Sequence, residues 1–175
     1  QLRIAETEKY AHVTYFFNGG TEKEFSREHR TLVPSPRVET YDLKPEMSAF
    51  EVTEKSMQAI ESNMYDFIVI NYANTDMVGH SGKISATIKA TETIDACIGN
   101  LHKLCKKKDY LLIITSDHGN ADCMIDSLNQ PCTTHTLNPV PFIICCQDEI
   151  ELKDGSLADI SPTILDLMGI EKSNE

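Results

Sequence analysis

The stretches that decide the fold are NYANTDMVGH at residues 71–80 and TSDHGN at residues 115–120. Each one overlaps the end of an apolar run, at residues 67–72 and 110–115, that predicts a buried strand. The polar side chains that follow would therefore lie at the carboxyl ends of these strands. In an open parallel sheet the carboxyl ends of the strands share one edge, and such proteins place their chemistry at that edge.

The polar side chains at this edge are carboxylates and imidazoles: Asp76, His80, Asp117 and His118. Taken singly, an aspartate after a strand is more often a turn former or a helix cap. Together, mixed oxygen and nitrogen donors suit Mn, Zn, Mg or Fe, so the combination favours a divalent metal site. We interpret Gly79 as the residue that lets the backbone fold tightly, so that Asp76 and His80 reach one ion.

A further candidate, His135, stands just before the apolar run at residues 140–146. Residues 136–139 can span only about 13 Å between them. If His135 joins Asp76 and His80 on one ion, the strand at 140–146 must begin near the edge where the other two end. It would then run antiparallel to them, which a mainly parallel sheet permits. The alternative is a parallel strand, with His135 an ordinary loop histidine at the opposite edge.

The other three histidines have no aspartate neighbours of this kind, and we expect them to be structural or exposed: His12, His29 and His102.

The remaining pattern alternates strands and helices. The expected elements are a strand at 12–17, a proline-bearing loop at 21–47, a helix at 48–63 opened by a capping box of Ser48 and Glu51, a long helix at 83–107, a hairpin at 121–136 and a short helix at 161–168 ended by Gly169. The long helix should bury one stripe, made of Ile84, Ile88, Thr91, Ile94, Ile98, Leu101 and Cys105. This order predicts an α/β fold, doubly wound, with a mainly parallel sheet and helices on both faces.

Composition limits the classes of function. The chain of 175 residues has 41% hydrophobic and 25% charged residues, typical of one globular domain, and no run long enough to span a bilayer. A net charge of −11 argues against nucleic acid or a membrane surface as a partner. Six cysteines without paired spacing indicate buried free thiols in a reducing cytosol, hence a cytoplasmic protein. A start at Gln1 instead of Met suggests an excised or truncated piece.

Several motifs carry a family resemblance. NTDMVGH at 74–80, TSDHGNAD at 115–122 and HTLNPVP at 135–141 resemble the metal motifs of the cofactor-independent phosphoglycerate mutases of the alkaline phosphatase superfamily. RIAETEKYAHVT at 3–14 and LADISPTILDLMG at 157–169 are similar to the same family. The resemblance covers nearly the whole chain, in order.

The resemblance implies two divalent metal ions, with Mn²⁺ preferred and Zn²⁺, Co²⁺ or Mg²⁺ as alternatives. By position, Asp76, His80 and His135 match the ligands of one ion, and Asp117 and His118 match ligands of the second.

The resemblance also implies a reaction. In this family a serine takes up the phosphoryl group of phosphoglycerate as phosphoserine and returns it, which interconverts 3-phosphoglycerate and 2-phosphoglycerate in glycolysis. Lys9 matches a catalytic, substrate-binding lysine that contacts the transferring phosphoryl group. The simpler interpretation of Lys9 is a solvated lysine beside Glu8.

Parts of the family pattern are missing from the chain. The family's serine nucleophile, a further aspartate ligand and an inserted phosphotransferase domain have no counterpart here, and Ser81 and Ser116 do not stand in the nucleophile motif. The resemblance therefore implies that residues 1–175 are the C-terminal portion of the metal-binding phosphatase domain, inactive alone. Its partners would be phosphoglycerate and the rest of the same protein, a monomer when complete.

Two other interpretations stay open. A phosphohydrolase or phosphopentomutase of the same superfamily would share the metal ligands, although the match at 3–14 lies outside the metal motifs and favours the mutase. A degenerate, non-catalytic metal-binding domain is the third, and the intact ligand positions argue against it.

Overall fold

The structure is a computed structural model that describes residues 1–146 and 150–171. It divides into two compact units, Gln1–Cys145 and Cys146–Glu175, which are described separately. The first unit holds all of the residues that the sequence marks for chemistry.

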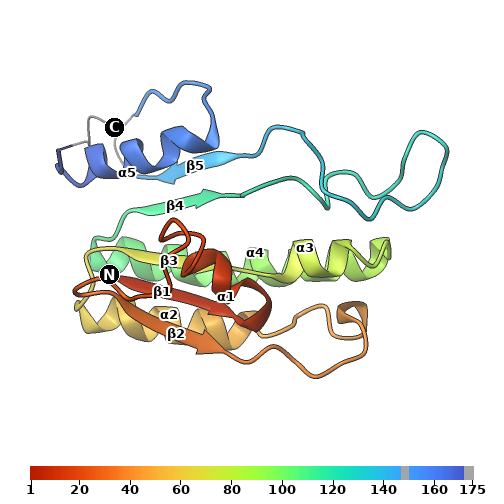
Figure 1. The fold of residues 1–175 in the computed structure, drawn as a ribbon, viewed down its shortest axis with the longest axis horizontal. Coiled ribbons are helices and arrows are strands. Elements are labelled where there is room, and N and C mark those ends of the chain that lie inside the picture. The colour runs from red at the N-terminus through yellow and green to blue at the C-terminus, as the bar shows by residue number, and fades with distance from the viewer. Residues whose placement is uncertain (147–149, 172–175) are drawn as a thin grey trace. The chain divides into compact units, whose positions relative to one another are not determined.

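A three-stranded parallel sheet forms the centre of the first unit (Figure 1). β1 (Leu2–Glu6) lies between β2 (His29–Val33) and β3 (Ile68–Asn71), and both neighbours run parallel to it. All residues of β1 are buried, including the charged Arg3 and Glu6. The carboxyl ends of the three strands therefore meet at one edge.

β4 (Leu112–Thr115) and β5 (Phe142–Cys145) form a separate two-stranded sheet. They pair antiparallel. We predicted that the strand after His135 runs antiparallel to its neighbours, and the pairing of β5 with β4 confirms this direction. Within the described residues no strand pairing joins β3 to β4. The alternation of strands and helices confirms the α/β class. The described strands form two sheets, however, where we expected one.

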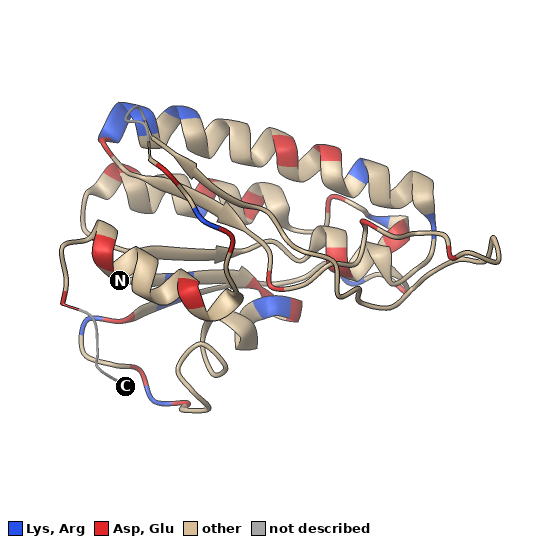
Figure 2. Cartoon of the chain, turned by 90° about the horizontal axis from the view of Figure 1, so that it is seen from above, with Lys and Arg blue, Asp and Glu red and all other residues tan. Residues whose placement is uncertain are grey.

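Helices cover both faces of the three-stranded sheet. α2 (Ala49–Ser62) and α4 (Ile84–Lys108) pack against each other on one face, and α1 (Thr7–Val13) lies on the other (Figure 1, Figure 2). Ile60 of α2 and Leu101 of α4 belong to one buried cluster with side chains of β3 and β4. Each such fully buried side chain contributes about 1.5–3 kcal/mol to folding, so this cluster fixes the helices on the strands.

The buried face of α4 differs from the predicted stripe. Leu101 is buried as expected, but Ile84 is 41% exposed and Ile88 is 54% exposed. The first turns of α4 bury Thr87 and Ala90 instead. These small side chains let α3 (Asn74–Gly79), the short helix after β3, pack closely against α4.

The strand predicted at residues 12–17 is wrong, because α1 ends at Val13 and turns follow over residues 14–19. The first strand is β1, which the sequence pattern hid. Its charged residues Arg3 and Glu6 break the apolar run by which a buried strand is recognised.

Residues 21–47 are not all loop, because they contain β2 and the 3₁₀ helix η1 (Tyr41–Leu43). The buried carboxylate of Glu6 ties this segment to the end of β1. It accepts hydrogen bonds from Ser35 Oγ at 2.9 Å and from the backbone N–H of Ser48 at 3.3 Å. Burial raises the pKa of Glu6, although the two hydrogen bonds oppose that rise.

α2 begins where predicted, but the capping box is wrong. Ser48 Oγ donates to the carbonyl of Pro34 at 2.7 Å, and no side chain caps the helix. The helix ends at Ser62. The next residue, Asn63, caps it with a left-handed backbone (φ 52°) and an N–H that donates to the carbonyl of Ile60.

The last turn of α4 carries Lys106, Lys107 and Lys108, the blue cluster at one end of the longest helix in Figure 2. Cations are favourable there because the carboxyl end of a helix dipole is negative.

The second unit contains η2 (Leu157–Asp159) and α5 (Ile160–Leu167). Ser156 and Asp159 form a capping box at its start, and Gly169 follows α5 with a φ of 66°. The predicted short helix and its glycine stop are therefore confirmed.

Cys97, Cys105, Cys123, Cys132 and Cys145 carry free thiols. Cys97 and Cys105 are buried as predicted, whereas Cys146 is exposed, so the expectation of burial is wrong for Cys146. Among the described residues no helix combines the length and the apolar character needed to cross a membrane.

Candidate metal centre

Two predicted ligands lie on one short helix. β3 leads into α3 (Asn74–Gly79), which carries Asp76 and is capped at its carboxyl end by His80. Residues four apart lie on the same face of a helix, and Asp76 Oδ1 is 3.1 Å from His80 Nε2. Helical spacing brings the pair together, so the tight turn that we assigned to Gly79 is wrong. Gly79 is absent from the glycines with positive φ.

His135 joins this pair from a distant segment. Its Nε2 lies 3.0 Å from Asp76 Oδ1 and 3.2 Å from His80 Nε2. Within the described residues this trio is the one group of three or more histidine, cysteine or carboxylate side chains whose donor atoms converge, all within 4.8 Å. The geometric prediction for His135 is thus confirmed, and a loop histidine at the opposite edge is excluded.

The hairpin before β5 orients the two imidazoles. His80 Nδ1 lies 2.7 Å from the carbonyl oxygen of Thr133, which can only accept, so Nδ1 donates to it and Nε2 is the ring nitrogen that faces Asp76. An antiparallel bridge joins Gly119 to Thr136, next to His135. Thr136 Oγ also donates to the Asp122 carboxylate at 2.9 Å, which anchors the His135 segment to the loop after β4.

The arrangement fits a divalent ion. The three donor atoms lie 3.0, 3.1 and 3.2 Å apart. With metal–ligand bonds of about 2.1 Å, neighbouring donors stand about 3.0 Å apart in an octahedral site and about 3.4 Å apart in a tetrahedral one. Three donors of this kind would leave the other positions of an ion open, as in catalytic sites.

Lys9 lies inside the site and is not a solvated lysine. It is 4% exposed, and its Nζ donates to Asp76 Oδ2 at 2.5 Å. Burial alone would raise the pKa of Asp76, but hydrogen bonds from Lys9 and Asn120 outweigh it and lower that pKa to about 2. Asp76 is therefore ionised at neutral pH and ready to bind a cation.

Asp117 and His118 lie beside the trio without completing a second one. His118 stacks on His135 with ring centroids 3.6 Å apart, and its Nε2 lies 3.5 Å from Asp117 Oδ1. The described residues add no third carboxylate, imidazole or thiolate that converges with this pair. The pair could hold a second ion only with ligands from elsewhere.

The two serines beside the ligands are engaged in local hydrogen bonds. Ser81 Oγ donates to the carbonyl of Val78 at 2.6 Å, and Ser116 Oγ donates to the carbonyl of His118 at 2.7 Å. Both hydroxyls thus donate to backbone carbonyls, which agrees with leaving both serines out of the nucleophile role.

Sequence reasoning missed two residues of this region. Asn120 donates to Asp76 Oδ1 at 2.7 Å, and its place in the SDHGN motif was the one available signal. His12 was set aside for lack of aspartate neighbours, yet the charges of Lys9, Asp117 and Asp76 all act on it. Its position three residues after Lys9, on the same face of α1, was the signal for His12.

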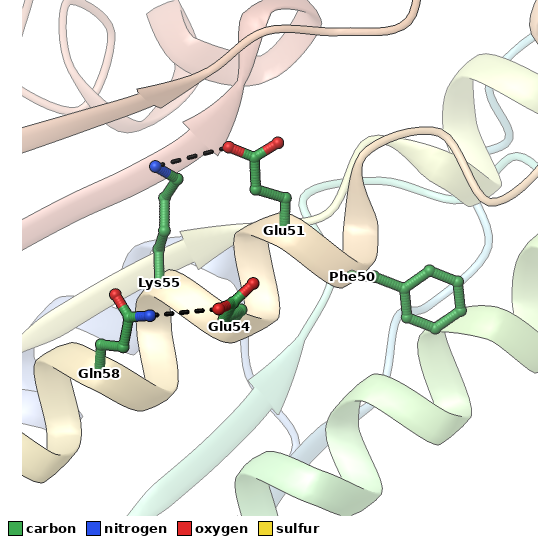
Figure 3. A pocket seen from close by; sticks show the side chains of 5 residues that line it. All are labelled: Phe50, Glu51, Glu54, Lys55 and Gln58. Atoms are coloured by element: carbon green, nitrogen blue, oxygen red, sulfur yellow. Dashed lines mark hydrogen bonds and ion pairs between the residues drawn. The ribbon is translucent and has the colours of Figure 1, made fainter.

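A shallow hollow along α2 is separate from this site. Figure 3 shows its lining side chains Phe50, Glu51, Glu54, Lys55 and Gln58, with Lys55 paired to Glu51 at 3.4 Å. It shares no residue with the metal trio.

Comparisons with known proteins show the family of the chain. The family model described as "Metalloenzyme superfamily" matches residues 1–172. The whole chain is 59% identical to a 2,3-bisphosphoglycerate-independent phosphoglycerate mutase of Gracilaria tenuistipitata var. liui and 58% identical to one of Wolbachia pipientis wMel, and it spans 35% of the length of each. A solved Leishmania mexicana phosphoglycerate mutase, determined at low cobalt concentration, matches with a TM-score of 0.89 and 33% identity, over 100% of this chain and 36% of that one.

The match over residues 1–172 shows the family to which the chain belongs. The chain belongs to the metalloenzyme superfamily, and it is similar to segments of 2,3-bisphosphoglycerate-independent phosphoglycerate mutases.

Proposed function

We propose that the chain is part of a phosphoglycerate mutase that interconverts 3-phosphoglycerate and 2-phosphoglycerate through a phosphoserine. In this proposal residues 1–175 are the C-terminal portion of the metal-binding phosphatase domain. The observation that carries it is the convergence of Asp76, His80 and His135 within 4.8 Å, in a chain that is 59% identical to a protein named as such a mutase.

In the proposed site the trio of Asp76, His80 and His135 holds one ion, and Asp117 with His118 contributes to a second. Mn²⁺ is our first choice, with Zn²⁺, Co²⁺ or Mg²⁺ as alternatives, because carboxylate and imidazole donors suit this group of ions. When bound, such ions neutralise phosphoryl charge and favour an ionised serine oxygen.

Lys9 is proposed to contact the transferring phosphoryl group. Its ammonium is held beside the ligand trio by Asp76, 2.5 Å away, and it is shielded from water. Electrostatic stabilisation of a phosphoryl oxygen is strongest where water is excluded. This placement supports a direct role rather than a surface one.

The chain alone lacks part of this machinery. It spans 35% of the length of its relatives, and within the described residues the β3 and β4 edges do not pair with each other. We propose that the remainder of the protein supplies the serine, a further aspartate ligand and the domain that binds the glycerate. We further propose that the complete protein is a monomer, that it is cytoplasmic and that it acts in glycolysis.

The test is turnover by the full-length protein. With Mn²⁺ and 3-phosphoglycerate, ³¹P NMR should show 2-phosphoglycerate and no free phosphate. His80→Ala should lower the apparent metal affinity by more than about 100-fold, since loss of an outer partner alone costs about 10–100-fold. The matched control is His102→Ala, because His102 is exposed on α4.

Two results would contradict the proposal. Release of inorganic phosphate in place of 2-phosphoglycerate would indicate a phosphohydrolase. Turnover by the 175-residue chain alone at the rate of the full-length protein would refute the assignment of the serine and the glycerate-binding groups to the remainder.

A further inference from the structure

A buried amide lies against the metal trio without belonging to it. Asn120 follows β4 and is 5% exposed. Its Nδ2 donates to Asp76 Oδ1 at 2.7 Å and lies 3.3 Å from the backbone carbonyl oxygen of Asp76. Both partners are acceptors, so the amide nitrogen, which is the donor, must face Asp76.

This contact decides which way the Asp76 carboxylate points. Oδ1, the oxygen that Asn120 holds, is the one 3.0 Å from His135 Nε2 and 3.1 Å from His80 Nε2. Oδ2 is held separately by Lys9. With one donor on each oxygen, the carboxylate cannot turn about its Cβ–Cγ bond without breaking a hydrogen bond.

Gly79 makes room for this amide. A methyl group at Gly79 would overlap the Asn120 Oδ1 atom. Gly79 has no positive φ, so its backbone conformation does not require glycine. Its lack of a side chain instead leaves room for the Asn120 amide. Asn120 Oδ1 is buried and has no hydrogen-bond partner, so its place is set by the hydrogen bonds of Nδ2 and by the fit against Gly79.

We propose that Asn120 is a positioning residue that sets the Asp76 carboxylate for the ion, and that Gly79 is the other half of the same device. The inference rests on the proposed metal site but not on the mutase reaction. Asn120 acts through Asp76 because its amide nitrogen is already donated to that carboxylate. Outer partners of this kind orient ligands and strongly affect metal affinity.

The experiment measures Co²⁺ binding to the full-length protein by calorimetry and by visible absorption, which reports ligand geometry. Asn120→Ala should weaken binding by about 10- to 100-fold and change the absorption bands. Gly79→Ala should do the same, because the methyl group displaces the amide. The double variant should bind no more weakly than Asn120→Ala alone, because the methyl group added at position 79 then meets the space that the Asn120 amide has left.

Matched controls separate this role from general damage. Gly99→Ala adds a methyl group to α4 where no atom lies within 4 Å, and Asn100→Ala truncates an exposed amide. Both should bind Co²⁺ as the parent protein does. Unchanged affinity and spectra for Asn120→Ala, or additive losses in the double variant, would overturn this inference alone. Failure of the unaltered protein to bind Co²⁺ would overturn the proposed metal site and this inference with it.

Discussion

Lys9 and Asp76 meet at 2.5 Å although 67 positions separate them in the chain. The ammonium sits on one oxygen of the carboxylate, while the other oxygen faces the two imidazoles. A lysine charge therefore already occupies the neighbourhood that a divalent cation would enter, and the two positive charges must compete for the same carboxylate.

This competition predicts that Lys9→Met binds Mn²⁺ more tightly than the parent chain. Repulsion between the ammonium and a divalent ion amounts to several kcal/mol even at an effective dielectric of about 20, so a gain of at least tenfold is expected. Calorimetry measures it, with Lys107→Met, an exposed lysine of α4, as the control. Weaker binding would instead mean that Lys9 is needed to hold Asp76 in place.

The two ion sites should differ in affinity. In the proposed centre Asp76, His80 and His135 would give three ligands to one ion, whereas Asp117 and His118 would give two to the other. A Mn²⁺ titration of the isolated chain should therefore show one ion bound more tightly than the second. Two equally tight sites, or no binding at all, would disagree with this arrangement.

Gly119→Ala should disturb the His135 segment. A methyl group there would overlap Thr136 Oγ and lie 2.7 Å from a carboxylate oxygen of Asp122. Overpacking of this kind costs about 1–3 kcal/mol of stability. Mn²⁺ binding should weaken as well, because Thr136 adjoins a ligand. Thermal unfolding and metal titration check both effects. Unchanged stability and affinity would show that the Thr136 segment moves aside without cost.

Glu6 predicts a dependence of stability on pH. Its folded-state pKa lies above the ordinary 4.5, chiefly through burial. The proton bound in the folded state stabilises it fully below 4.5, and this contribution is lost as the pH rises through the raised pKa. Glu6→Gln removes the titration, so its melting temperature relative to the parent should rise between pH 5 and pH 8. A difference that does not change with pH would contradict the raised pKa.

The parts of the site that lie at the ends of apolar strands could be predicted from the sequence. The runs that became β3 and β4 are uninterrupted, so the places of Asp76 and Asp117 followed from them. These inferences needed only the hydrophobic pattern. For His135, the short reach of the chain to β5 left two positions open, and the resemblance to the family's metal motifs favoured the one beside Asp76.

The remainder depended on tertiary contacts that no local pattern records. β1 was missed because Arg3 and Glu6 are buried through specific partners, which the apolar pattern does not show. The burial of Lys9 and the role of Asn120 appear only once distant segments meet. Ile84 and Ile88 show the opposite error, because both lie on the predicted apolar stripe but are exposed. Helical periodicity identifies an apolar face, but it does not show whether another element packs on that face.

The ligand trio also bears on how the protein folds. His135 is 59 positions from Asp76 and 55 from His80, so the unfolded chain has no preassembled site. Such distant pairings form late, because the entropy of closing long loops must first be overcome. A bound ion would close these loops from within, as a removable cross-link between α3 and the hairpin. Withdrawing it with a chelator would therefore loosen the folded state itself, beyond emptying a site.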